Sequence, residues 1–247
     1  MTNTKAEAGL IVALDVEDAG AAERMIGALE GTAHFFKIGL ALQLAPGVDE
    51  LIRSAIKQGK EIFLDYKYYD VPETLRKAVS RAANLGVSFL TIHGPSNLIR
   101  AAVQGRGSSD LKLFTVTVLT SMDAGDIAEM GYINHSVEEL VLIRARKALE
   151  AGCDGVIASG LETQRIKQVS GDKLLVVTPG IRPEGYPEDD QKRKVTPGDA
   201  IRAGADYLVV GRPITGDNNP AEAARRILID MQEAFDSLSY LSSGASI

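Results

Sequence analysis

The chain has 247 residues, and its 27 lysines and arginines against 33 aspartates and glutamates give a formal net charge of −6. This acidic balance argues against a nucleic-acid-binding protein, which usually carries a basic excess. The single cysteine, Cys153, excludes an intrachain disulfide and a cysteine-based metal cluster, and it favours a cytoplasmic setting. No apolar run approaches the roughly 18 residues of a membrane helix, and segment 1–8 is polar, so we expect no membrane association and no signal peptide.

From the N-terminus onward, short apolar runs alternate with longer segments of helical spacing. The predicted strands are 10–16, 35–38, 62–66, 88–92, 113–119, 155–158, 174–178 and 207–210. The clearest predicted helices are 19–29, 48–58, 72–85, 137–151 and 221–235. Gly86, Gly152 and Gly204 each end a helical segment just before a strand, which is typical of repeated helix-to-strand connections.

Eight strands that alternate with helices predict parallel β-α units, and strands buried on both faces explain the nearly continuous apolar runs. Eight units in 247 residues match a single closed (β/α)8 TIM barrel. The alternative is a doubly wound open sheet, which usually has a glycine-rich turn after its first strand, where this chain reads Asp-Val-Glu-Asp (15–18). We therefore predict one domain over 1–247, with the barrel at about 10–237 and a Ser-rich, fraying tail at 238–247.

Active sites of such barrels lie at the carboxyl ends of the strands, so the polar residues at those ends are the candidates. They are Asp15, Lys37, Asp65, Lys67, His93, Thr120, Ser121, Arg182 and Arg212.

The third strand is the most informative, because it ends in Asp-x-Lys-x-x-Asp (65–70). Strand side chains alternate between faces, so Asp65 and Lys67 share a face with Phe63. Asp70 follows where the chain turns toward the helix that Pro72 opens. Buried charges of this kind must compensate one another. They form either a structural ion-pair cluster or a catalytic network, and their place at the rim of the barrel favours the second.

Two charged residues at earlier strand ends extend this pattern. Lys37 ends the second strand and would complete a network with Asp65, Lys67 and Asp70, although alone it would be interpreted as an exposed lysine. Asp15 ends the first strand and is either a capping acid or a further member of the site.

The last two strands predict an anion site. The seventh ends in Thr-Pro-Gly-Ile-Arg (178–182) and the eighth in Val-Gly-Arg-Pro-Ile (210–214). The loops after these two strands commonly bind phosphate in TIM barrels, with help from a helix N-terminus. Gly211 leaves room for backbone N–H groups and Arg212 supplies a charged fork, so we predict phosphate binding here.

Other motifs add little. His34, His93 and His135 lack metal-ligand spacing, and His93 is expected to pack at the fourth strand. A catalytic-triad elbow, a His-Glu-x-x-His motif and a P-loop are all missing from the sequence. We therefore predict no metal site.

Taken in order, these fragments resemble the orotidine 5′-monophosphate decarboxylase family from about residue 10 to residue 235. The fragments are Ala-Leu-Asp (13–15), Phe-Lys-Ile-Gly (36–39), Asp-x-Lys-x-x-Asp-x-Pro-x-Thr (65–74), Leu-Thr-Ser-Met (119–122), Thr-Pro-Gly-Ile-Arg-Pro (178–183), Asp-Gln (190–191) and Val-Gly-Arg-Pro (210–213). The resemblance implies formation of UMP, the last step of de novo pyrimidine biosynthesis, without a metal or organic cofactor.

The resemblance also implies roles for the charged residues. Lys67 is similar to the proton donor to C6 of the pyrimidine, and Asp65 to the carboxylate beside the leaving CO2 group. Lys37 resembles the lysine that links the network and contacts the ribose, and Asp15 a partner of the ribose hydroxyls. Asp70 and Thr74 resemble residues that enter the neighbouring subunit's site, which implies a homodimer with shared active sites.

The remaining binding residues follow from the same resemblance. Thr120 and Ser121 match the segment that reads the pyrimidine edge. Arg182, Gln191, Gly211 and Arg212 match the phosphate side, where the loop after the seventh strand acts as a lid.

The sequence departs from the family at several positions. Leu-Lys-Phe-His is usual where this chain has Tyr66, Lys67, Tyr68 and Tyr69, and Asn is usual at Glu73. Glu184 replaces a common glutamine, and we leave it out of the site. Two other functions remain open. One is an Mg²⁺-dependent decarboxylase of a sugar-acid phosphate, which would want an acid where Lys37 stands. The other is a non-catalytic phospho-ligand binding barrel.

Overall fold

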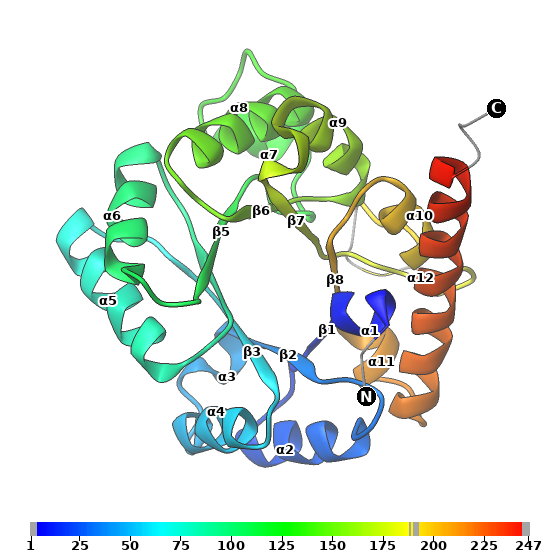
Figure 1. The fold of residues 1–247 in the computed structure, drawn as a ribbon. Coiled ribbons are helices and arrows are strands. Elements are labelled where there is room, and N and C mark those ends of the chain that lie inside the picture. The colour runs from blue at the N-terminus through cyan, green and yellow to red at the C-terminus, as the bar shows by residue number, and fades with distance from the viewer. Residues whose placement is uncertain (1–3, 188, 190–192, 244–247) are drawn as a thin grey trace.

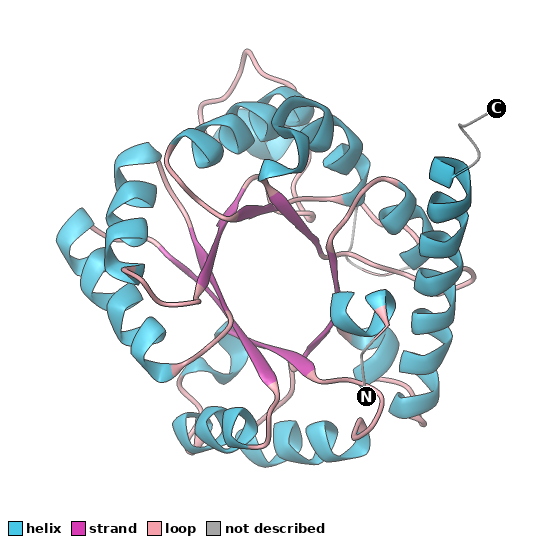
Figure 2. Ribbon diagram, in the orientation of Figure 1, coloured by secondary structure: helices cyan, strands magenta, loops and turns pink. Residues whose placement is uncertain are grey.

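The computed structural model describes residues 4–187, 189 and 193–243. Eight parallel strands form one closed barrel in sequential order, β1 to β8, and β8 pairs with β1 to complete it. Figures 1 and 2 show the helices as an outer ring around this barrel. The predicted (β/α)8 TIM barrel is confirmed.

The strands are β1 (Leu10–Ala13), β2 (Phe35–Gly39), β3 (Glu61–Tyr68), β4 (Phe89–Ile92), β5 (Lys112–Val116), β6 (Gly155–Ile157), β7 (Leu175–Thr178) and β8 (Tyr207–Val210). The helices are α1 (Lys5–Gly9), α2 (Ala19–Ala28), α3 (Leu40–Gln43), α4 (Val48–Lys57), α5 (Pro72–Leu85), α6 (Ser96–Arg106), α7 (Ala124–Glu129), α8 (Val137–Glu150), α9 (Gly160–Ser170), α10 (Pro197–Arg202), α11 (Arg212–Thr215) and α12 (Pro220–Ser243).

Element ends differ from the sequence prediction in three informative places. β1 and β5 stop at Ala13 and Val116, three residues before their predicted ends, because the chain there leaves the sheet to form the rim of the barrel. β3 continues to Tyr68 rather than to residue 66. α12 continues to Ser243, so the helix extends into the predicted Ser-rich tail.

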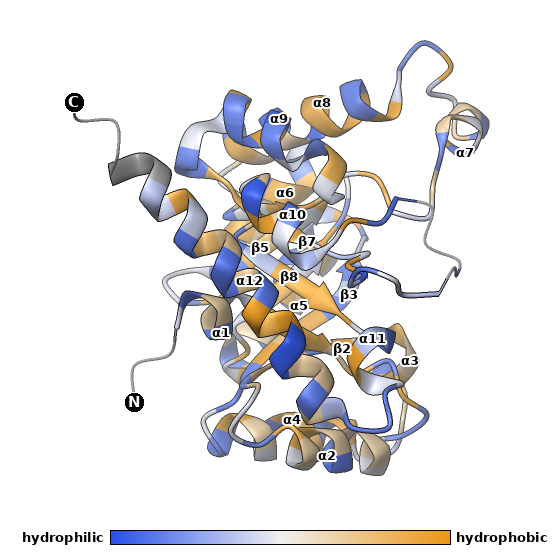
Figure 3. Ribbon diagram, turned by 90° about the vertical axis from the view of Figure 1, so that its right-hand side faces the viewer, coloured by the Kyte–Doolittle hydropathy of each residue, from blue (hydrophilic) through white to orange (hydrophobic). Residues whose placement is uncertain are grey.

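The apolar core has two layers. One fills the barrel itself with large side chains, among them Phe35, Phe63, Phe89 and Phe114, whose rings pack against one another. The other lies between the outer face of the strands and the helices. Figure 3 shows the apolar strands at the centre and helices with mixed polar and apolar faces around them. Burial on both faces explains the near-continuous apolar runs of the strands.

The phenylalanine layer also decides where a ligand can enter. Phe63 on β3 is followed on the same strand face by Asp65, which lies nearer the carboxyl end of the barrel. Asp65 and Lys67 therefore lie above the aromatic layer and line the cavity. Within the described residues, the helices are too short or too polar to cross a membrane.

Candidate active site

A cavity of about 480 Å³ opens at the carboxyl ends of the strands. Its walls come from nearly every strand of the barrel or the loop that follows it. The lining residues include Asp15, Lys37, Phe63, Asp65, Lys67, Leu119, Thr120, Ser121, Ile157, Arg182, Gly211 and Arg212. The strand-end prediction thus brings together most of its candidates in one cavity.

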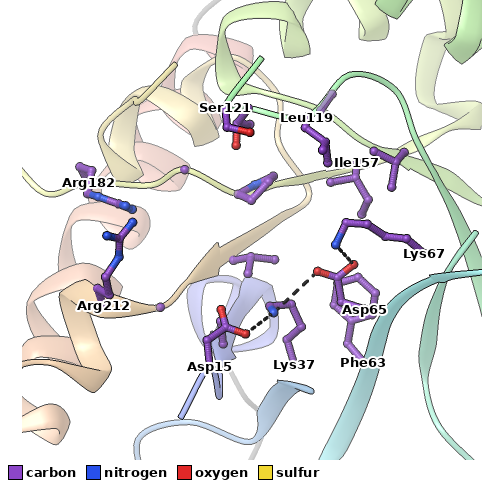
Figure 4. A pocket seen from close by; sticks show the side chains of 18 of the residues that line it. Asp15, Lys37, Phe63, Asp65, Lys67, Leu119, Ser121, Ile157, Arg182 and Arg212 are labelled. Carbon is purple, nitrogen blue, oxygen red and sulfur yellow. Dashed lines mark hydrogen bonds and ion pairs between the residues drawn. The ribbon is translucent and has the colours of Figure 1, made fainter. Parts of the chain in front are cut away.

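Four charged side chains of alternating sign lie along one wall of the cavity (Figure 4). We call them the charge chain; in order they are Asp15, Lys37, Asp65 and Lys67. Lys37 Nζ lies 2.9 Å from Asp15 Oδ1 and 3.6 Å from Asp65 Oδ2. Lys67 Nζ donates to Asp65 Oδ1 at 2.9 Å. Two carboxylates and two ammonium groups balance one another, which is what makes their partial burial tolerable.

The backbone of Lys67 is unusual. Its φ of 47° is the one positive φ of a non-glycine residue in the described part of the chain. The register between β3 and β4 shifts here, from Leu64 opposite Leu90 to Tyr68 opposite Ile92, which marks a bulge in β3. Left-handed backbone at a non-glycine residue costs free energy and clusters at functional sites. The bulge turns the Lys67 side chain into the cavity.

Thr91 on β4 supports this geometry. Its Oγ1 accepts the backbone N–H of Lys67 at 2.9 Å and lies 2.9 Å from Asp65 Oδ1. One buried hydroxyl therefore fixes both the bulge and the carboxylate between the two lysines. Thr91 was not among the predicted site residues, although alternation along β4 places it on the same face as the inward-facing Phe89.

Gly39 lets the charge chain close. A Cβ atom at this position would stand 2.9 Å from both Asp15 Oδ1 and Lys37 Nζ, which is closer than real Cβ contacts allow. A side chain at this position would displace the end of Asp15 or Lys37, so the glycine of the Phe-Lys-Ile-Gly sequence leaves this ion pair undisturbed.

The surroundings of Asp65 favour its ionised form. Burial alone would raise the pKa of this carboxyl, but Lys37, Lys67 and the hydrogen bonds from Lys67 and Thr91 together hold the pKa below its ordinary value. Asp65 is therefore a carboxylate, and not a carboxylic acid, at neutral pH.

This lowered pKa predicts how stability depends on pH. In the unfolded chain the pKa of an aspartate is about 3.9. The ionised Asp65 should therefore add to the free energy of unfolding of the wild-type protein, relative to Asp65→Asn, above that pH. This contribution is lost as the pH falls through the lower pKa of the folded state. Denaturant unfolding of both proteins between about pH 7 and pH 3 measures the difference. Parallel stability curves below about pH 4 would contradict the assigned direction.

The opposite side of the cavity is cationic. Arg182 follows β7 and Arg212 follows β8, and Figure 4 shows their guanidinium groups close together, across the cavity from Lys67. Asp189 Oδ2 binds both, at 2.6 Å from Arg182 Nη2 and 3.2 Å from Arg212 Nη2. Arg182 is almost fully buried, whereas about half of Arg212 is exposed. Two guanidinium groups suit a phosphate dianion, and the carboxylate that they share was not among the predicted site residues.

A third wall is formed after β5, where Leu119, Thr120 and Ser121 line the cavity together with Ile157 of β6. The wall offers apolar contact and hydroxyl groups, which suits a flat heterocycle with a polar edge.

Four predicted residues are not confirmed as part of this cavity. Asp70 is exposed and its Oδ1 accepts the N–H of Val71 at 2.6 Å, and Thr74 is exposed on α5. His93 packs its ring on Tyr69, as the sequence analysis expected of it. Gln191 lies outside the described residues.

The tyrosines that depart from the family pattern do not enter the cavity. Tyr66 and Tyr68 pack on the outer core, and burial raises the pKa of Tyr66 to about 12. Glu73, the other departure on this stretch, pairs with Arg76 and Lys77 on the surface of α5. The departures therefore leave the charge chain intact.

The described residues hold no group of three His, Cys, Asp or Glu side chains arranged to bind a metal ion. The carboxylates of the charge chain are each bonded to a lysine instead.

Comparison with known proteins gives a consistent result. The chain is 52% identical over 225 residues to orotidine 5′-phosphate decarboxylase of Nitrobacter winogradskyi, covering 91% of this chain and 93% of that protein. It is 47% identical to the Methylorubrum extorquens enzyme of the same name, covering 91% and 96% of the two chains. The crystal structure of orotidine 5′-phosphate decarboxylase from Lactobacillus acidophilus superposes with a TM-score of 0.79 at 35% identity, over 90% of this chain and 98% of that one.

The sequence profile of one family spans nearly the whole barrel, matching residues 8–227. This match and the identity to the two relatives show that the chain belongs to the orotidine 5′-phosphate decarboxylase / HUMPS family.

Proposed function

We propose that this protein decarboxylates orotidine 5′-monophosphate to UMP, the last step of de novo pyrimidine biosynthesis, without a metal or organic cofactor. The observation that carries the proposal is the charge chain, which faces a cavity whose other end holds two arginines. Relatives that are 44–52% identical over most of this chain bear the name of that enzyme.

Lys67 is the proposed proton donor. When the bond between C6 and the carboxyl carbon breaks, CO2 leaves and the electron pair stays on C6. A positioned ammonium group stabilises this developing charge and then transfers a proton from Nζ to C6, and solvent returns the proton to the lysine. The 2.9 Å bond to Asp65 keeps the Lys67 side chain in place.

Asp65 is proposed to stand beside the substrate carboxylate. Its lowered pKa keeps it ionised, so the two negative groups repel each other until CO2 leaves. Lys37 is proposed to hold Asp65 from the other side and, with Asp15, to meet the ribose hydroxyls.

The phosphate is proposed to bind Arg182 and Arg212, with Gly211 and Gln191 beside them, while Thr120 and Ser121 bind the edge of the pyrimidine. Binding energy from a phosphate far from C6 can be used to order the groups around the reacting carbon. In this arrangement Arg182 and Arg212 bind the phosphate at one end of the cavity, and the reacting carbon lies beside Lys67 at the other end.

A homodimer with shared sites is part of the proposal. Asp70 and Thr74 lie on the surface beside the mouth of the barrel rather than in their own cavity. Tyr69 and Val71 flank Asp70 and are 65% and 63% exposed. Apolar side chains next to a charged residue suit a surface that a second copy covers, with Asp70 and Thr74 reaching that copy's site.

An assay with an excess of chelator tests the reaction. Purified protein given orotidine 5′-monophosphate and EDTA should release CO2 and UMP in equal amounts, since lysine and aspartate side chains supply all the proposed groups. A strict need for Mg²⁺ would favour the sugar-acid phosphate decarboxylase that the sequence left open. Binding of UMP without turnover would favour a non-catalytic barrel.

A further inference from the structure

Arg193, in the segment between β7 and α10, makes contacts that neither the sequence pattern nor the charge chain explains. Its side chain is only 11% exposed, and it is not among the residues that line the cavity. Nη1 donates to Glu162 Oε1 at 2.6 Å. Nη2 donates to the carbonyl oxygens of Leu119 at 3.0 Å and Val118 at 3.2 Å. One guanidinium group thus joins three chain segments.

The two carbonyls belong to the stretch that precedes Thr120 and Ser121. β5 has ended at Val116, so sheet hydrogen bonds no longer fix this stretch of the rim. Thr117 still bonds to Ile157, the Val118 side chain packs in the outer core, and the Leu119 carbonyl also accepts the N–H of Met122. Arg193 adds the hydrogen bonds that tie the Val118 and Leu119 carbonyls to α9 and the loop after β7. Arg193 therefore contacts the backbone directly before the two residues that line the cavity.

Glu162 fixes Arg193 in turn. It lies in the first turn of α9, and its side chain is buried. The pair compensates its own charge, because a buried carboxylate would be costly without a cation. A planar guanidinium with several N–H groups is needed here, since a lysine ammonium is a point charge on a flexible stem and does not reproduce the fork.

We propose that Arg193 is a positioning residue for the base side of the cavity: by bonding the Val118 and Leu119 carbonyls, it sets where Thr120 and Ser121 meet the nucleobase. The inference rests on the proposed function, because it takes those two residues to contact the base. It assigns no contact between Arg193 and the substrate.

Three ligands separate this role from a merely structural one. Competition titrations would measure binding of UMP, uridine and ribose 5-phosphate to wild-type protein and to Arg193→Lys. Uridine and UMP should each bind about tenfold more weakly to the variant, while ribose 5-phosphate, which has no base, should bind unchanged. Arg165→Lys is the matched control, because Arg165 makes an exposed ion pair with Glu138 and should leave all three unchanged.

A second substitution tests the path. Combined with Ser121→Ala, Arg193→Lys should cost less than the sum of the two single changes in UMP binding, because the displaced segment has already lost its contact. If Arg193→Lys does not fold, Glu162→Gln should produce the same base-selective loss in smaller size, since it removes the charge that fixes Arg193.

Several results would overturn the inference. Equal weakening of all three ligands would mean a general structural role, and unchanged uridine binding would mean that the base side does not depend on Arg193. Wild-type protein that binds UMP no better than ribose 5-phosphate would instead refute the base side of the proposed function, and with it this inference.

Discussion

Replacing Lys67 by alanine is expected to lower the rate of decarboxylation by about 10⁴-fold or more, while UMP binding changes by no more than about tenfold. The loss is large because one ammonium group both stabilises the charge at C6 and supplies the proton. UMP binding should survive, because Arg182 and Arg212 stand at the other end of the cavity. Steady-state kinetics and UMP titration of the same preparation measure the two effects.

The control for this substitution is Lys77→Ala. Lys77 is an exposed lysine on α5 that pairs with Glu73, so its loss should leave both the rate and UMP binding unchanged. A variant Lys67→Ala that loses UMP binding and unfolds at lower denaturant would show that Lys67 holds the fold together. A variant that retains substantial activity would remove it as the proton donor.

Sequence patterns predicted this site well where strand periodicity governs side-chain direction. Alternation placed Asp65 on the face of Phe63, and the closure of the barrel brought Lys37 and Asp15 to the same rim. These positions follow from backbone geometry alone, because neighbouring parallel strands present their carboxyl ends at one edge.

Alternation also placed Lys67 on the cavity face, but it did not predict the backbone geometry of this residue. The bulge in β3 and the positive φ at Lys67 depend on the Thr91 hydroxyl of the next strand. This contact is tertiary: alternation gives the face on which Thr91 lies, but not its bond to Lys67.

The contacts around the seventh strand were missed for a related reason. Asp189 and Arg193 lie in an irregular loop, where neither the period of a helix nor that of a strand indicates the direction of a side chain. Their ion-pair partners, Arg212 and Glu162, lie elsewhere in the sequence. The place of the two loops after the seventh and eighth strands, with Gly211 and Arg212, indicated an anion site but not which residues bond to one another.

The role of Asp70 could not be judged from a single copy of the chain. This residue lies on the surface, and a single copy gives it no substrate to contact. The role proposed for Asp70 depends on a second copy, so the experiment that tests it must mix subunits.

Mixing equal amounts of the Lys67→Ala and Asp70→Asn proteins, each nearly inactive, should restore about a quarter of wild-type activity after subunit exchange. Half of the dimers are then mixed, and each mixed dimer has one site with both native residues, since Asp70 of one copy serves the cavity of the other. The double variant mixed with wild-type protein is the control. In an equal mixture of this kind, shared sites leave only the wild-type homodimers active, so activity should be about a quarter of that of wild-type protein at the same total concentration. Independent sites would leave every wild-type subunit active, so activity would be about a half. Absence of recovery, despite exchange proven by mass spectrometry of the mixed dimers, would place Asp70 outside the active site of its neighbour.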